Sequence, residues 1–313
     1  MLLSCGDALI DFVPVKSADG RDAYVPAVGG SCLNIAVAMS RLGSPTGFVG
    51  GISTDMFGTM VADHLAASNV SLRHARHSDN ETTLAFVRFV NGEPHYAFYD
   101  EVTAAQLWAY DPTLFSFDQI DALHVGSTTL INEPAATEYL TMFRDAKGRT
   151  TLSFDPNCRP SLVRNKTKYL ARMAEFIAIA DIVRMSDLDF DFLFGGTDFQ
   201  NKANEALARG VALFVVTRGS EGVVAWHATA GQVEVPAPAV NVVDSIGAGD
   251  TFQGSLLVAL REAGRIERSA LEAISRDELA AVLAFGTRCA AITCSRAGAN
   301  PPWKSEVSPS RDR

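Results

Sequence analysis

The segment Asp244-Ser-Ile-Gly247-Ala248-Gly249-Asp250-Thr-Phe252 joins a glycine-rich turn to an apolar, helix-like run that continues to Leu260. Its glycines allow a tight turn and the close approach of a bulky anion. Unpaired N–H groups at the start of the helix, together with the helix dipole, would attract that anion. Asp250 adds a carboxylate that can take a proton from an attacking hydroxyl. An anion cradle with a base suits phosphoryl transfer to an alcohol, and the alternative is an ordinary turn with Asp250 at a helix N-terminus.

A second glycine pair lies near the N-terminus, in Gly29-Gly30-Ser-Cys-Leu-Asn34, and precedes a helix-like run. A further glycine-rich segment follows at 50–58. With these motifs in this order, the chain resembles the ribokinase-like (PfkB) family of sugar kinases, which carries Gly-Gly-x-x-x-Asn and, later, Asp-x-x-Gly-Ala-Gly-Asp. The resemblance extends from Gly6 to about Trp303. It implies a three-layer α/β/α sandwich with a mostly parallel central sheet and a small β-sheet lid.

Length, charge and cysteine usage narrow the class of protein. The 313 residues fit one large α/β domain. The formal net charge is −9, and Lys and Arg do not cluster anywhere along the sequence. Both features argue against a nucleic-acid partner. The five cysteines show neither a Cys-x-x-Cys pair nor zinc spacing, as is typical of reduced thiols in the cytoplasm. No apolar run approaches the roughly 18 residues of a membrane span.

Apolar, strand-like runs alternate with helix-like periodicity along most of the chain. This alternation predicts a mostly parallel sheet with helices on both faces, and ligands beyond the carboxyl ends of its strands. The expected strands are 2–10, 46–50, 122–125, 150–154, 181–185 and 212–217, and the expected helices are 33–42, 56–67, 135–146, 168–178, 201–209, 251–263 and 277–291.

Two segments, 23–27 and 83–99, are β-like and break this alternation. The run 84–90, the dipeptide Asn91-Gly92 and the run 95–99 are typical of a hairpin. In the resembled family, segments at these positions form a lid over the sugar that commonly doubles as a dimer interface; the alternative is a plain edge hairpin. We therefore expect the hairpin to pair with the segment 23–27 and a homodimer to form through the lids. The expected domain spans residues 1–304, with lid segments at about 11–27 and 83–100 and a disordered tail at 305–313.

The resemblance implies roles for the residues that would contact the sugar. Asp250 matches the catalytic base, and since an exposed Asp has a pKa near 4, it is expected to be ionised at pH 7 without special tuning. Asp11 matches a carboxylate that binds sugar hydroxyls; a surface strand-end Asp is the alternative. Gly30 and Asn34 match further sugar contacts. Arg159, in Asp155-Pro-Asn-Cys-Arg159, would clamp phosphate or substrate, with a structural salt bridge as the alternative.

For the nucleotide, Thr217-Arg-Gly219-Ser-Glu-Gly222 matches the Thr-x-Gly-x-x-Gly loop of the family. Ser186 and Thr287 are also expected beside the nucleotide. The chain contains no Walker A motif and no dinucleotide fingerprint after a strand, so the expectation of ATP rests on this loop.

The resemblance also implies metal ions. The family often has Asn-x-x-Glu near the nucleotide phosphates and Mg²⁺, whereas this chain has Ser186-Asp-Leu-Asp189. Asp189 would act on Mg²⁺ through water, and the serine favours the fructokinase-like branch. Asp244 and Ile246 match a site for a monovalent cation such as K⁺.

Together these features predict an ATP-dependent sugar kinase that phosphorylates a hydroxymethyl group, with fructose as the expected substrate. The principal alternative is 2-keto-3-deoxygluconate kinase, whose substrate carries a carboxylate; the expected lid strands offer only Arg88 as a nearby cation. Ribokinase or a nucleoside kinase comes next. From another class of protein, a sugar-binding sensor on an inactive kinase scaffold is disfavoured by the intact glycine-rich loop.

Overall fold

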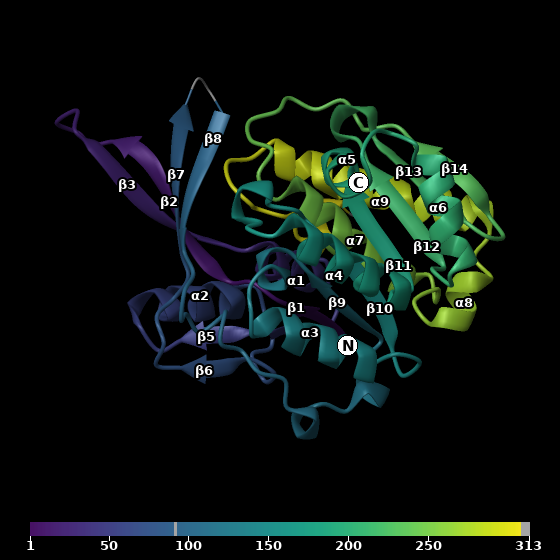
Figure 1. The fold of residues 1–313 in the computed structure, drawn as a ribbon. Helices are drawn as coiled ribbons and strands as arrows, with labels where there is room; N and C mark the ends of the chain where they lie inside the picture. Colours follow the sequence, from purple (N-terminus) through teal and green to yellow (C-terminus); the bar gives the residue numbers. More distant parts are fainter. Residues whose placement is uncertain (91–92, 308–313) are drawn as a thin grey trace.

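The central sheet of the computed structural model, which describes residues 1–90 and 93–307, has eight strands (Figure 1). Six of them are parallel, and β13 and β14 extend the sheet with antiparallel pairings. The order is β14 (Gly231–Val235), β13 (Val223–His227), β12 (Leu213–Thr217), β11 (Ile182–Ser186), β10 (Thr151–Asp155), β9 (Ala122–Gly126), β1 (Leu2–Cys5) and β4 (Thr46–Val49).

Helices cover both faces of this sheet, which confirms the predicted three-layer sandwich. Every residue of β1, β9 and β10 is buried, as expected for parallel strands packed on both sides. One face packs against α3 (Ala135–Asp145), α4 (Lys166–Ile179), α5 (Asp187–Phe194) and α6 (Phe199–Ala208). The other packs against α1 (Ser31–Arg41), α7 (Ala248–Glu262), α8 (Arg268–Glu272) and α9 (Arg276–Cys294).

A separate four-stranded sheet projects from the body beside α1 and α2 (Met56–Ala67) (Figure 1). We call it the lid sheet. Its order is β3 (Asp22–Gly29), β2 (Leu9–Lys16), β7 (Leu84–Val90) and β8 (Glu93–Tyr99). The expected hairpin is formed by β7 and β8. Its Asn91-Gly92 turn lies outside the described residues.

The structure corrects two details at the N-terminus. The expected strand 2–10 is two strands in different sheets, because the backbone turns at Gly6, whose φ is +148°. That break lets β1 enter the central sheet while β2 enters the lid sheet. The segment 23–27 does not pair with the hairpin, since β2 lies between β3 and β7.

The remaining elements are short, apart from α2 (Met56–Ala67). Residues 305–307, which were expected to belong to a disordered tail, lie in α10, and Glu306 forms an ion pair with Arg296. The rest of the expected tail lies outside the described residues. None of the helices in the described ranges is long and apolar enough to cross a bilayer. The other elements are β5 (Gly51–Ser53), β6 (Arg76–Ser78), α10 (Lys304–Val307), η1 (Pro112–Leu114), η2 (Phe117–Gln119), η3 (Thr128–Leu130), η4 (Pro160–Leu162) and η5 (Gly219–Glu221).

Candidate active site

Polar side chains gather at one edge of the central sheet because its parallel strands all end there. Asp155, Ser186 and Thr217 are the last residues of β10, β11 and β12. Asp7 and Thr128 follow the ends of β1 and β9. The glycine-rich loop before α7 meets the same edge, since Gly249 lies beside Arg184 of β11. The motifs singled out in the sequence therefore lie at the carboxyl edge of the sheet, as expected.

Asp250, the third residue of α7, is buried beneath the start of α1. Its Oδ1 accepts a hydrogen bond of 2.7 Å from the Ser31 hydroxyl, and its Oδ2 accepts one of 2.9 Å from the Asn34 amide. Burial raises the pKa of Asp250, while these two donors and the charge of Arg159 act to lower it. The expectation of an exposed carboxylate with an ordinary pKa was therefore wrong. A raised pKa makes the carboxylate a stronger proton acceptor.

The start of α7 leaves backbone N–H groups available to an anion. Gly247 precedes the helix with φ +74°, and a Cβ there would lie 2.6 Å from the Cβ of Ala299. No side chain caps the helix, and within the described chain the N–H groups of Gly249 and Asp250 donate to no acceptor. These N–H groups and the helix dipole face the same region as the Asp250 carboxylate, so an anion bound there would lie next to a base.

Arg184, which sequence reasoning missed, places a buried cation beneath this loop. Its Nη1 donates to Asp155 Oδ2 at 2.5 Å, and its Nη2 donates to Thr217 Oγ1 at 2.6 Å. A Cβ at Gly249 would lie only 2.9 Å from Nη2, so the glycine lets the loop approach the guanidinium. Burial raises the pKa of Asp155 to about 6, although the charge of Arg184 opposes this. A lone arginine inside an apolar strand was the signal in the sequence.

Asp11 lies on the lid sheet and faces this site. A Cβ at Gly29 would lie 2.2 Å from Asp11 Oδ2, so the carboxylate lies directly against the glycine pair. Burial raises the pKa of Asp11 to about 6; the charge of Asp7 adds to this shift and that of Arg159 opposes it. Asp11 and Asp250 are thus both within electrostatic reach of Arg159.

Arg159 keeps most of its donors available. Its Nη1 donates to the carbonyls of Asn157 and Cys158, at 3.2 and 3.0 Å. Among the described residues no carboxylate forms an ion pair with it, so the structural salt bridge that competed with a binding role is not found there. Its remaining N–H groups can meet an oxyanion.

Both carboxylate oxygens of Asp7 accept hydrogen bonds, which connect it to the start of α1 and to the segment after β9. Its Oδ1 accepts from the backbone N–H of Cys32 at 2.9 Å, and its Oδ2 accepts from the hydroxyls of Ser127 and Thr128. Gly30, with φ +110°, is the residue before the helix. Cys32 is buried, with its thiol 3.4 Å from the carbonyl of Gly126, which supports a packing role.

The expected nucleotide residues lie at the ends of β11 and β12 and in α9. Thr217 is held by Arg184, and Gly219 and Gly222 flank the turn η5. Ser186 caps α5. Thr287 is buried in α9, where its hydroxyl donates to the carbonyl of Ala284 at 3.0 Å.

Both carboxylate oxygens of Asp189 already accept hydrogen bonds from other groups of the chain. Its Oδ1 accepts from the Cys158 N–H at 2.7 Å, and its Oδ2 accepts from both the N–H and the hydroxyl of Ser186. This capping box leaves the buried carboxylate little capacity for the expected Mg²⁺ contact. The part of the chain that the structure describes contains no group of three His, Cys, Asp or Glu side chains able to hold a metal.

The expected monovalent-cation residues fold the loop that leads into α7. Asp244 Oδ1 accepts from the N–H of Ile246 at 3.0 Å, and its Oδ2 accepts from the N–H of Gly298 at 2.8 Å. The loop is thereby tied to the segment that follows α9, which also carries Ala299 against Gly247.

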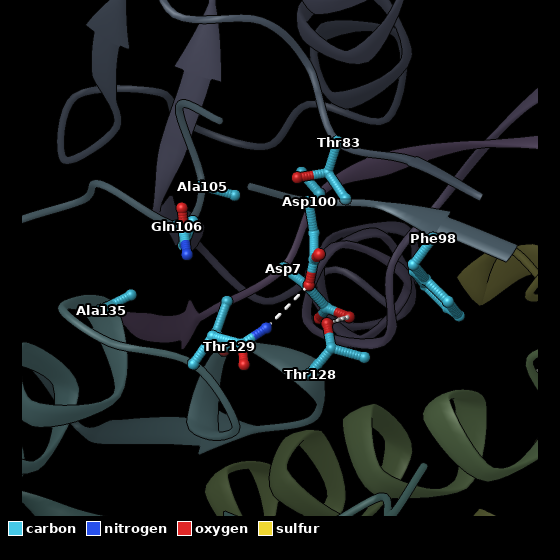
Figure 2. A pocket seen from close by; sticks show the side chains of 11 residues that line it. Asp7, Thr83, Phe98, Asp100, Ala105, Gln106, Thr128, Thr129 and Ala135 are labelled. Carbon is cyan, nitrogen blue, oxygen red and sulfur yellow. Dashed lines mark hydrogen bonds between the residues drawn. The ribbon is translucent and has the colours of Figure 1, made fainter. Parts of the chain in front are cut away.

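A small pocket that is open to solvent lies under the lid sheet and is bordered by Asp7 (Figure 2). Phe98 and Asp100 line it from the end of β8, and Thr128 lines it from the segment after β9. Asp7 borders this pocket and also influences Asp11 and Asp250 through its charge. The pocket therefore adjoins the site.

Comparison with known proteins agrees with this geometry. A family model described as pfkB family carbohydrate kinase matches residues 1–306. A fructokinase of Rhizobium leguminosarum bv. trifolii is 38% identical over 261 residues, which are 83% of this chain and 80% of that protein. The structure resembles that of Xylella fastidiosa fructokinase with bound ATP, with TM-score 0.88 and 28% identity, covering 98% and 96% of the two chains. It also resembles a Vibrio cholerae O395 fructokinase double mutant in a form with bound fructose, ADP and potassium ion, with TM-score 0.81 and 25% identity, covering 95% and 93%.

Proposed function

Because the chain belongs to the pfkB family of carbohydrate kinases, we propose that it transfers the γ-phosphoryl group of ATP to a hydroxymethyl group of fructose. One observation carries this proposal. The open N–H groups of Gly249 and Asp250 lie next to a buried carboxylate, opposite a lid sheet that presents Asp11. The names of the fructokinase relatives support fructose as the acceptor.

Each group has a task in the transfer. Asp250 accepts the proton of the sugar hydroxyl while the hydroxyl oxygen forms a bond to the γ-phosphorus. At the same time, the bond between the γ-phosphorus and the bridging oxygen of ADP breaks. Ser31 and Asn34 hold the carboxylate in position. The N–H groups at the start of α7 stabilise the charge on the phosphoryl oxygens, with Arg159 adding donors. Movement of the lid sheet over the sugar would exclude water and prevent idle hydrolysis of ATP.

Two kinds of cation accompany this proposal. The Mg²⁺ that accompanies ATP would offset the negative charge of the phosphates. Since Asp189 is already hydrogen-bonded, no step is assigned to it. A monovalent cation would bind at the loop of Asp244 and the Ile246 carbonyl. The potassium ion in the Vibrio cholerae O395 fructokinase double mutant supports binding of a monovalent cation. Equal turnover in KCl and in a salt of a bulky organic cation would exclude it.

We also propose that the protein is a cytoplasmic homodimer paired through its lid sheets. The cysteines are all free thiols, four of them buried, which supports a reducing compartment. The face of the lid sheet that points away from Asp11 carries an aromatic cluster with exposed members, which supports a partner there.

The test is an ADP-release assay over a panel of ketoses, aldoses, sugar acids and nucleosides, repeated with Asp250→Asn. Fructose should give the highest kcat/KM. Asp250→Asn keeps the size of the side chain but removes the proton acceptor, so kcat should fall by about 10²–10⁴ while sugar binding is largely kept. Asp63→Asn, which neutralises an exposed carboxylate on α2, is the matched control and should change neither value. Near wild-type turnover by Asp250→Asn would remove its role as base.

A further inference from the structure

The pocket under the lid sheet lies on the same side of that sheet as Asp11. Asp11 pairs with Ala85 of β7, and Ala85 pairs with Phe98 of β8, so the three residues form one row across the sheet. Directly opposed residues share a face, and neighbouring strands are about 4.8 Å apart, which puts Phe98 roughly 10 Å from Asp11. Asp7 borders the pocket and lies within electrostatic reach of both Asp11 and Asp250. An acceptor held between Asp11 and Asp250 would therefore extend its other end towards the pocket.

The lining of this pocket carries negative charge without a cation. Its eleven described lining residues include two carboxylates, Asp7 and Asp100, and no Lys, Arg or His. Asp7 is buried, and its oxygens already accept three hydrogen bonds within the chain. It contributes charge to the pocket but little free hydrogen-bonding capacity.

Asp100 is different because part of its carboxylate remains available. Its Oδ2 accepts a hydrogen bond of 2.8 Å from the Asn132 amide, the dashed line that reaches Asp100 in Figure 2. Its Oδ1 accepts no hydrogen bond from any described residue. Gln106 also lines the pocket, and its Oε1 accepts from the N–H of Val102. A free carboxylate oxygen requires a donor, which a hydroxyl supplies and a ligand carboxylate does not.

We propose that Asp100 is a specificity-determining residue: this pocket takes the uncharged, hydroxyl-bearing end of the acceptor and rejects acceptors that end in a carboxylate. The inference rests on the proposed function, since it names the acceptor class for the same site. A neutral sugar would donate a hydroxyl hydrogen bond to Asp100. A sugar acid would place acceptor against acceptor and negative charge near Asp100 and Asp7, an arrangement that disfavours the wrong ligand by repulsion.

The experiment measures kcat/KM for fructose and for 2-keto-3-deoxygluconate, and compares the ratio of the two among variants. In Asp100→Asn the charge is lost but the shape is kept. We expect a fall of roughly tenfold or more for fructose, because a hydrogen bond to a charged group is lost. The acid should improve relative to fructose. Glu101→Gln removes a neighbouring charge outside the lining and should leave the ratio unchanged.

A second variant tests the same idea in the opposite direction. Gln106→Glu adds a negative charge to the pocket while keeping an acceptor for the Val102 N–H, so it should suppress turnover of the acid further. An unchanged ratio in both pocket variants, or an equal change in Glu101→Gln, would overturn the inference. If the wild type turns over another neutral sugar instead of fructose, only the proposed substrate fails, and the ratio is measured with that sugar. A wild type that prefers the acid overturns the inference and leaves the kinase assignment intact.

Discussion

Asp11 carries its negative charge in surroundings that oppose it, and this should be visible both in binding and in stability. Burial raises its pKa to about 6, with Asp7 contributing. Asp11→Asn removes the charge with little change of shape. We expect the sugar KM to rise about tenfold or more through lost charge-assisted hydrogen bonds, while the ATP KM stays nearly constant. An equal rise in both constants would mean that Asp11 maintains the fold instead.

The same variant should be more stable than the wild type at alkaline pH. A carboxyl whose folded pKa is about 6, above its unfolded value of roughly 3.9, contributes stability below pH 4 and loses it as the pH rises through 6. Asp11→Asn avoids that loss, so its Tm should exceed that of the wild type at pH 8, by roughly 2–4 °C for each kcal/mol. The difference should shrink at pH 5. A difference independent of pH would contradict this linkage.

Arg184 combines a structural task with an electrostatic one, and two variants separate them. Arg184→Met leaves Asp155 buried without its partner, which should cost about 3–5 kcal/mol of unfolding free energy. Adding Asp155→Asn removes the unpaired charge and should restore much of that stability, as measured by urea unfolding. We expect kcat of the double variant to remain at least tenfold low, since the cation beneath Gly249 is missing. Wild-type turnover would show that Arg184 serves only to neutralise Asp155.

At the scale of elements, the sequence predicted what depends on local pattern. Periodicity located β9, β10, β11 and β12 and most of the long helices, and the glycine-rich loop located the start of α7. It did not predict that Gly6 divides β1 from β2, because both strands are apolar and only the tertiary fold sends them to different sheets. The order of the lid sheet depends likewise on long-range pairing, which a single sequence does not specify.

The site shows the same division. Asp250 and Asn34 stand in motifs and were found, but their mutual hydrogen bond joins residues distant in sequence. Burial raises the pKa of Asp250 above the ordinary value that was expected. The sequence does not show this, because exposure is a property of the folded chain. Arg184 and Asp100 belong to no motif, so only the structure reveals what surrounds them. A single sequence thus identifies residues that stand in motifs more readily than residues whose role depends on contacts formed in the folded chain.

The lid sheet should respond to sugar as a unit. It projects from the body (Figure 1), and Asp11 and Phe98 lie on the same face of it. If sugar draws the sheet down, amide hydrogen exchange in the described parts of β7 and β8 should slow severalfold with saturating sugar, since closure restricts local opening. Amides of β12, within the central sheet, serve as the internal reference. Equal exchange with and without sugar would show that these strands do not act as a lid.

At the scale of the whole molecule, the outer face of the lid sheet, which points away from Asp11, leaves aromatic side chains partly exposed. Phe86 stacks on Phe12 and meets Tyr24 and Tyr99 edge-on, and the two tyrosines remain 45% and 63% exposed. Exposed aromatic surface on a thin sheet is typical of an interface, and a symmetric dimer would cover it on both copies.

Sedimentation at micromolar concentration should therefore give the mass of a dimer. Tyr24→Asp combined with Tyr99→Asp should give monomers, because each substitution would bury an unpaired charge in the interface. Leu114→Asp is the matched control: it places the same charge on a similarly exposed apolar residue of η1, outside the lid sheet, and should leave the dimer intact. A wild type that sediments as a monomer would refute the dimer. If instead the wild type and the tyrosine variant both sediment as dimers, the copies pair through a surface other than the lid sheet.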